Sequence, residues 1–197
     1  MKAYYHARAP EYDDWWLGRG PFADRDRPGW DEELDELRRV VASLPPARTL
    51  DVACGTGFLT RHLRGEVVGL DQSAAMLEIA QGQAPDTTFV QGDALALPFD
   101  DGEFNRLFTS YFYCHLEEPE RMRFLAEARR VADELVIVGT RWREGEQVER
   151  YEERKLGDGS CWQVFKRVFV ADELLAELGG GEVIHEGNRY FLVVRSP

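Results

Sequence analysis

Three aspartates, each in or directly after a short apolar run, are the residues of this sequence best suited to binding a polar ligand. Asp51 lies in TLDVACGTG, Asp71 follows 20 residues later at the end of VVGLD, and Asp93 ends FVQGD. Gly55 and Gly57, just beyond the first aspartate, allow a tight turn and a close approach of the backbone to a ligand. A phosphate would suit the glycines but would be repelled by the carboxylate, whereas hydroxyl groups or an ammonium group suit both.

The elements that must position these aspartates alternate between strand and helix patterns. Strands are predicted at residues 48–53, 66–71, 87–93, 105–113 and 134–140, and helices at residues 31–46, 57–63, 73–82, 118–132 and 171–178. Such alternation predicts parallel strands joined by crossover helices, and ligands bind beyond the carboxyl ends of strands in such sheets. The tail, residues 181–196, predicts an antiparallel hairpin with a tight turn at Gly187 and Asn188.

The composition argues against several classes of partner. The net charge is −12, with 36 acidic and 24 basic residues, so no nucleic-acid partner is expected. The longest aliphatic stretch, LVIVG, is too short to span a bilayer, and the first residues lack the apolar core of a signal peptide, so no membrane insertion is expected. The 3 cysteines and 4 histidines are scattered, so neither disulfides nor a metal site are expected. We expect one cytoplasmic domain over residues 1–197, either a monomer or a homodimer.

Two segments depart from the alternating pattern. Residues 1–28 are rich in aromatic side chains, and Tyr4, Arg8 and Tyr12 follow each other at intervals of four, which puts them on one face of a helix. That face suits an aromatic lid over a ligand, and equally a cluster packed on the sheet. Residues 142–162 are charged and poor in aliphatic side chains, which is typical of a solvated surface insertion and also compatible with a flap over an active site.

Taken together, the motifs resemble a known family. LDVACGTGFLT, VVGLDQSAAML, FVQGDALALPFDDGEF and RLFTSYFYCHLEEP are similar to the successive motifs of class I S-adenosylmethionine-dependent methyltransferases, over residues 50–140. The similarity is to small-molecule members, including the quinone-methylating type. It implies an α/β, Rossmann-like fold with a seven-stranded, mostly parallel sheet in the order 3-2-1-4-5-7-6, strand 7 antiparallel, and helices on both faces. It also implies S-adenosyl-L-methionine as cofactor, S-adenosyl-L-homocysteine as product and a small-molecule methyl acceptor.

The resemblance also indicates candidate cofactor contacts. They are Asp51, Ala53 and Gly55 for the methionine part, with Gly57 in the same turn, Asp71 for the ribose, Gln72, Met76, Asp93 and Ala94 for the adenine, and Ser110 beneath the sulfonium. Tyr4 and Arg8 of the N-terminal segment are expected near the cofactor's carboxylate. Met76 equally suits packing, because it belongs to the apolar face of a predicted helix.

The candidate catalytic residues follow the fourth predicted strand. Methyl transfer from a sulfonium is an in-line displacement with a neutral leaving group, so alignment of the reactants is the main task. A nucleophile that carries a proton also needs a general base. His115 and Tyr111 are the candidates, and His115 is preferred as the base because histidine titrates near neutral pH. A capping or packing role for His115 is the alternative.

Two other functions stay open. A nicotinamide-dependent oxidoreductase would use the same kind of sheet, but Asp51 stands where a pyrophosphate would lie, and Thr60 replaces the third glycine of G-x-G-x-x-G. A regulatory or scaffold protein that binds S-adenosylmethionine without catalysis would keep the cofactor residues and need no general base.

Overall fold

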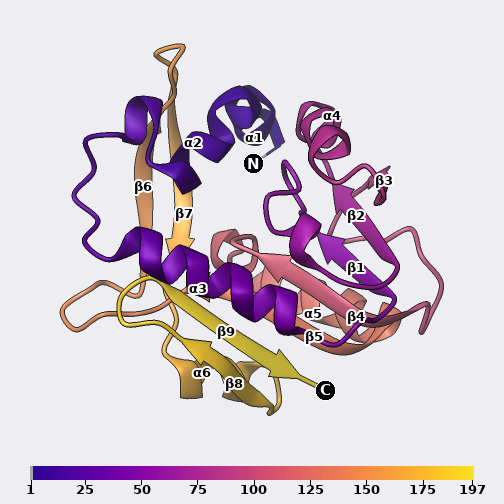
Figure 1. Ribbon diagram of the computed structural model, residues 1–197. Helices are drawn as coiled ribbons and strands as arrows, with labels where there is room; N and C mark the ends of the chain where they lie inside the picture. The colour runs from indigo at the N-terminus through magenta and orange to yellow at the C-terminus, as the bar shows by residue number, and fades with distance from the viewer. Residues whose placement is uncertain (1) are drawn as a thin grey trace.

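The computed structural model describes residues 2–197, so Met1, the first residue of the predicted lid, lies outside the described residues. Its main sheet has seven strands (Figure 1). In spatial order they are β3 (Thr88–Gln91), β2 (Val67–Asp71), β1 (Thr49–Val52), β4 (Phe104–Ser110), β5 (Ala132–Thr140), β9 (Phe191–Ser196) and β8 (Glu182–Glu186). The strand β9 runs antiparallel to both of its neighbours, β5 and β8, and all the other pairs in this sheet are parallel. When the separate pair β6 and β7 is set aside, this is the predicted order 3-2-1-4-5-7-6, which is confirmed.

Helices cover both faces of the sheet, as predicted. In Figure 1, α3 (Trp30–Ser43) lies in front of the sheet, and α5 (Glu118–Val131) and α6 (Ala171–Glu177) lie behind it. The helix α4 (Ala74–Gln83) connects β2 to β3 and is capped by Ser73, whose Oγ accepts from Met76 N. None of the helices in residues 2–197 combines the length and apolar character that a bilayer-spanning helix needs.

The predicted helix at residues 57–63 is wrong, because the structure has only a 3-10 turn there, η3 (Thr60–His62). Gly55 and Gly57 both have positive φ angles, 57° and 77°, so the chain turns through residues 54–59 instead of entering a helix. A three-residue turn offers little dipole, so a helix N-terminus does not contribute to binding at this loop.

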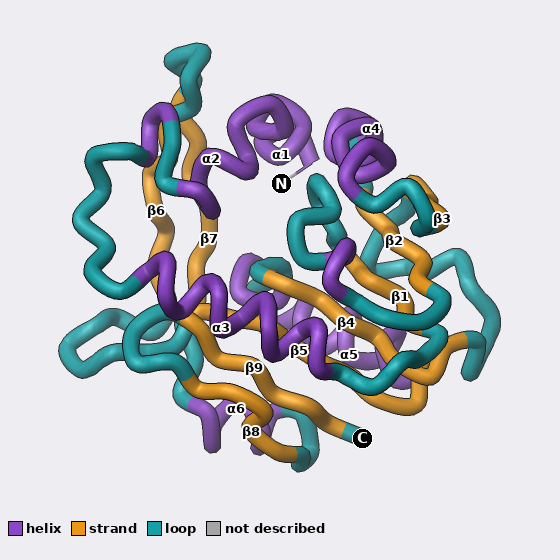
Figure 2. The backbone as a smooth tube through the Cα atoms, in the orientation of Figure 1, coloured by secondary structure: helices purple, strands orange, loops and turns teal. Residues whose placement is uncertain are grey.

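The charged segment 142–162 contributes to an ordered hairpin that stands away from the main sheet (Figure 2). Its strands are β6 (Glu149–Lys155) and β7 (Cys161–Arg167). Exposure alternates along β6, so one face is turned to solvent and the other to the protein. Apolar contacts between Tyr4, Leu156 and Val164 attach this hairpin to the N-terminal segment.

The N-terminal segment folds as α1 (Lys2–Arg8), η1 (Ala9–Glu11) and α2 (Tyr12–Leu17). The predicted single helical face is therefore interrupted, at Pro10 in the first turn of η1. Its residues still gather, because Arg8 Nη1 donates to Tyr4 Oη at 2.7 Å and the Arg8 guanidinium lies 5.1 Å from the centre of the Tyr12 ring. Since α1 also contacts α4, it bridges the hairpin and the main sheet.

The predicted tight turn of the C-terminal hairpin is wrong, because four residues, 187–190, separate β8 from β9. The buried Glu33 of α3 holds this loop, since its carboxylate accepts from Arg189 N at 2.9 Å and Tyr190 N at 3.1 Å. A Cβ on Gly187 would lie 2.3 Å from Glu33 Oε2, so a larger residue there would displace this carboxylate from the loop. The loop conformation is thus set by a partner far away in the sequence.

We expect Glu33→Ala to lower the free energy of unfolding by about 2 to 3 kcal/mol, because two backbone N–H groups lose a charged acceptor. Chemical denaturation measures this loss, and Glu32→Ala, at an exposed position on the same helix, is the matched control. Equal stabilities of the two variants would contradict the role given to Glu33.

Candidate active site

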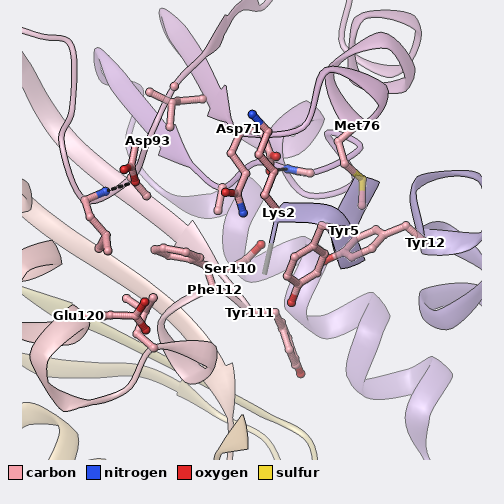
Figure 3. A pocket seen from close by; sticks show the side chains of 18 residues that line it. Lys2, Tyr5, Tyr12, Asp71, Met76, Asp93, Ser110, Tyr111, Phe112 and Glu120 are labelled. Atoms are coloured by element: carbon pink, nitrogen blue, oxygen red, sulfur yellow. Dashed lines mark hydrogen bonds between the residues drawn. The ribbon is translucent and has the colours of Figure 1, made fainter. Parts of the chain in front are cut away.

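A cavity of about 340 Å³ opens beside the carboxyl ends of β1, β2 and β4 (Figure 3). Most of the sequence-predicted cofactor residues line it, together with one of the two candidate catalytic residues. They are Ala53, Gly55, Asp71, Gln72, Met76, Asp93, Ala94, Ser110 and Tyr111. Parallel pairing brings these segments together, because β2 and β4 flank β1 in register. We call this space the first cavity; that its lining residues contact a cofactor stays a prediction.

Asp71 links the tips of β1 and β2. Its Oδ2 accepts from Gly55 N at 3.0 Å and its Oδ1 from Ser73 N at 2.8 Å. Burial raises the pKa of Asp71, and these backbone N–H groups oppose that rise by favouring the charged form. Each carboxylate oxygen can accept more than one hydrogen bond, so Asp71 retains acceptor capacity on the cavity side.

Asp51 and Gly57 lie behind the lining and not within it. Asp51 is 1% exposed, and its Oδ2 accepts from Thr60 Oγ1 at 2.6 Å. Its Oδ1 is buried without a hydrogen-bond partner among the described residues. Burial, helped by the nearby charge of Asp71, raises the pKa of Asp51 to about 7, although the Thr60 hydroxyl opposes this. Gly57 shapes the turn, because its N–H donates to Cys54 O at 3.0 Å.

Two residues of the first cavity have strained backbones. Among the described residues, Ala53 (φ 58°) and Tyr111 (φ 52°) are the non-glycine residues with positive φ. Each such conformation costs on the order of 1 to 3 kcal/mol and persists only where the surroundings enforce it. Tyr111 N donates to Val138 O at 2.9 Å, and its buried ring packs against Trp15 and Trp16. These contacts therefore hold Tyr111 in its strained conformation at the tip of β4.

The N-terminal segment contributes to two different spaces. Tyr5 and Tyr12 line the first cavity, and Figure 3 shows their rings next to each other. Tyr4 and Arg8, predicted near the cofactor's carboxylate, line a second cavity of about 580 Å³ between this segment and the β6–β7 hairpin. Sequence analysis missed Tyr5 as a lining residue. The sequence contains a signal for this role. Tyr4 and Tyr5 are adjacent on a helix, so their side chains point in different directions and can line different cavities.

His115 lines neither cavity in the described part of the chain. It is buried, and its Nδ1 lies 2.7 Å from Phe165 O, so Nδ1 carries a proton and donates to that carbonyl. Burial, followed by the charges of Lys166 and Arg154, lowers the pKa of His115 well below its usual value. The imidazole is thus neutral at physiological pH, and a role as general base stays a prediction.

The described residues contain no cluster of three or more histidine, cysteine, aspartate or glutamate side chains arranged to hold a metal ion. The two cavities share one lining residue. Tyr111 lines both, so they meet at the tip of β4.

Comparison with known proteins agrees with this architecture. A family model described as a methyltransferase domain matches residues 49–134. A demethylmenaquinone methyltransferase of Thermotoga maritima is 36% identical over 107 residues, which cover 52% of this chain and 44% of that protein. An uncharacterized methyltransferase of Alkaliphilus oremlandii is 25% identical over 179 residues, covering 84% and 82% of the two chains. The chain thus spans less than half the length of the demethylmenaquinone methyltransferase.

The solved structures extend the likeness over the whole chain. A structure titled as the DhpI-SAM-HEP complex has a TM-score of 0.77 at 25% identity, covering 99% of this chain and 95% of that one. A DhpI-SAH complex has a TM-score of 0.72 at 26% identity, with 99% and 94% covered. In its motifs, its strand order and its overall fold the chain is thus similar to class I S-adenosylmethionine-dependent methyltransferases.

Proposed function

We propose that this protein transfers a methyl group from S-adenosylmethionine to a small-molecule acceptor. The observation that carries the proposal is the charge of the first cavity. Asp71, Asp93 and Glu120 line it, and Lys2 is the one basic residue among its described lining residues. S-adenosylmethionine presents hydroxyl groups, amines and a positive sulfur to these carboxylates, whereas the pyrophosphate of a dinucleotide would be repelled.

The lining residues fit the parts of this cofactor. Asp71 has acceptor capacity left for the two ribose hydroxyls. Asp93 lines the same cavity just beyond the end of β3, and Leu95 N donates to its Oδ1 at 2.9 Å. We propose that this carboxylate binds an amine at the place of the adenine ring. Met76 is 1% exposed and packs beside that place. Ser110 and Tyr111 border the end where the reactive methyl group would lie.

Catalysis in this arrangement depends on alignment more than on acid–base chemistry. When bound, S-adenosylmethionine supplies an electrophilic methyl group on a positively charged sulfur. The residues of this chain must place the acceptor in line with that group and exclude water from it. The aromatic side chains of Tyr5, Tyr12 and Tyr111 line the first cavity, and Tyr111 also lines the second, which suits this task.

The family match does not extend to the acceptor. The methyltransferase-domain model covers residues 49–134, which include most of the first cavity but neither α1 nor the β6–β7 hairpin. The acceptor must therefore be inferred from the second cavity of this chain. We also propose a cytoplasmic setting, which rests on the scattered cysteines of the sequence.

The proposal is tested by calorimetric titration of the protein with S-adenosylhomocysteine and, separately, with NADH. We expect binding of the former alone; tight NADH binding without S-adenosylhomocysteine binding would favour the oxidoreductase instead. Incubation with methyl-labelled cofactor and a metabolite extract then distinguishes an enzyme from a scaffold. Label that reaches no compound across many extracts would favour the scaffold.

Asp71→Asn should weaken S-adenosylhomocysteine binding by about tenfold or more, because charged hydrogen bonds to the ribose are lost. The amide keeps one acceptor oxygen for the loop, and circular dichroism checks the fold. Asp86→Asn, at an exposed position before β3, is the control and should bind like the wild type. Equal affinities of the two variants would remove Asp71 from the cofactor site.

The raised pKa of Asp51 predicts how stability depends on pH. The folded protein holds this proton up to about pH 7, while the unfolded chain releases it near the ordinary value of 3.8. Folding therefore becomes less favourable as the pH rises between these values, and levels off above about 7. Relative to Asp51→Asn, we expect the wild type to lose roughly 2 to 3 kcal/mol between about pH 5 and about pH 8.

Urea denaturation of both proteins across this pH range measures the difference, with Asp86→Asn expected to follow the wild type. A difference between wild type and Asp51→Asn that stays constant with pH would show that Asp51 titrates normally.

A further inference from the structure

The second cavity is strongly basic although the chain as a whole is acidic. It shares Tyr111 with the first cavity, and residues of the N-terminal segment and of the β6–β7 hairpin line it. Eight basic and three acidic side chains line it, in a chain whose net charge is −12. Like charges repel each other inside a cavity, so this arrangement is unfavourable unless something negative binds there.

The alternation of the hairpin explains how these charges gather. Arg150, Glu152 and Arg154 lie on the half-buried face of β6, while the residues between them are exposed. In the antiparallel register, Arg150 stands opposite Lys166 of β7, so both side chains lie on that same face. Two basic residues directly opposite each other destabilise a hairpin, which indicates that the face serves binding.

Lys166 is the most deeply placed of these cations. Its side chain is 6% exposed, and its Nζ donates to Thr140 Oγ1 at 2.6 Å and to Cys114 Sγ at 3.3 Å. It forms no ion pair with any described residue, and an ammonium group has a third N–H to donate. The Nζ also lies 5.0 Å from the centre of the Tyr111 ring, which borders the first cavity. Burial lowers the pKa of Lys166, and the charge of Arg154 adds to this.

The other cations are only partly neutralised. Glu152 is shared, because it pairs with Arg150 at 2.7 Å and with Arg154 at 2.9 Å. Arg8 is 4% exposed, forms no ion pair within residues 2–197, and its Nε is buried without a hydrogen-bond partner there. The cavity therefore holds unsatisfied donors and uncompensated positive charge, two features that point to an anionic ligand.

We infer that the methyl acceptor is a small organic acid whose oxyanion, a carboxylate or a phosphate-type group, is bound by Lys166 and Arg154 in the second cavity. This inference rests on the proposed function for its methyl donor. Aromatic side chains of Trp15, Trp30 and Tyr111 line the same cavity and suit an apolar or aromatic body. An uncharged acceptor would leave Lys166 and Arg8, which form no ion pair with the described residues, without a counter-charge.

The test uses three small aromatic probes, benzoate, phenyl phosphate and the neutral benzamide. Each is titrated into the wild-type protein, with and without S-adenosylhomocysteine, and followed by calorimetry and by the tryptophan fluorescence of the protein. We expect at least one of the two acids to bind about tenfold more tightly than benzamide. Preference between benzoate and phenyl phosphate identifies the kind of oxyanion. Acids that bind no better than benzamide would overturn the inference.

Variants then locate the anion. Lys166→Met and Arg154→Met should each weaken binding of the preferred acid by about tenfold while leaving benzamide unchanged. Arg39→Met, at an exposed position on α3, removes the same charge elsewhere and should have no effect. S-adenosylhomocysteine affinity reports on folding of each variant. If Lys166→Met does not fold, Arg154→Met decides, and unchanged acid binding in it would overturn the inference.

The same titrations separate this inference from the proposed function. A wild type that binds S-adenosylhomocysteine but neither acid contradicts the inference alone. A wild type that binds an acid but no S-adenosylhomocysteine contradicts the proposed function and leaves an anion site in a protein of other activity.

Discussion

The hydrogen bond from Gly55 N to Asp71 Oδ2 joins the tips of β1 and β2, and the shape of the first cavity depends on it. A buried carboxylate needs partners, and here the backbone provides them through the glycine turn and through Ser73 N. These hydrogen bonds fix the glycine turn at the edge of the cavity, next to Ala53 with its strained backbone. The paired strands β1 and β2 set the position of the cavity, and side chains that follow β3 and β4 complete its lining.

Two neighbouring cavities of opposite charge are the main functional feature of this protein. Among their charged lining residues, the first has three carboxylates and one ammonium group, and the second has eight basic and three acidic groups, with Tyr111 common to both. A positively charged donor and a negatively charged acceptor would each be attracted to its own space and also to each other. The net charge of −12 conceals this arrangement, because an average over the surface does not describe a local field.

Sequence patterns predicted the sheet well because strand ends and connections are local features. The aspartates after three apolar runs and the glycine turn follow from residues close together in the chain. The strand order was implied by the family resemblance, and eight of the cofactor residues that the resemblance indicated line one cavity. Features that depend on distant partners were not predictable. Glu33 sets the loop before β9, and the register of β6 with β7 turns Lys166 inward. Residues of β6 alternate between exposed and half-buried positions, but charged side chains occupy both. The sequence of this segment therefore resembled a solvated surface, and the strand was not predicted.

The short helix α1 forms part of the wall of both cavities. Lys2 and Tyr5 face the first, while Tyr4 and Arg8 face the second. The same seven residues also contact α4 and, through Tyr4, the β6–β7 hairpin. Displacement of this one helix of about two turns would open both cavities together, so exchange of a ligand in one cavity would be mechanically coupled to exchange in the other.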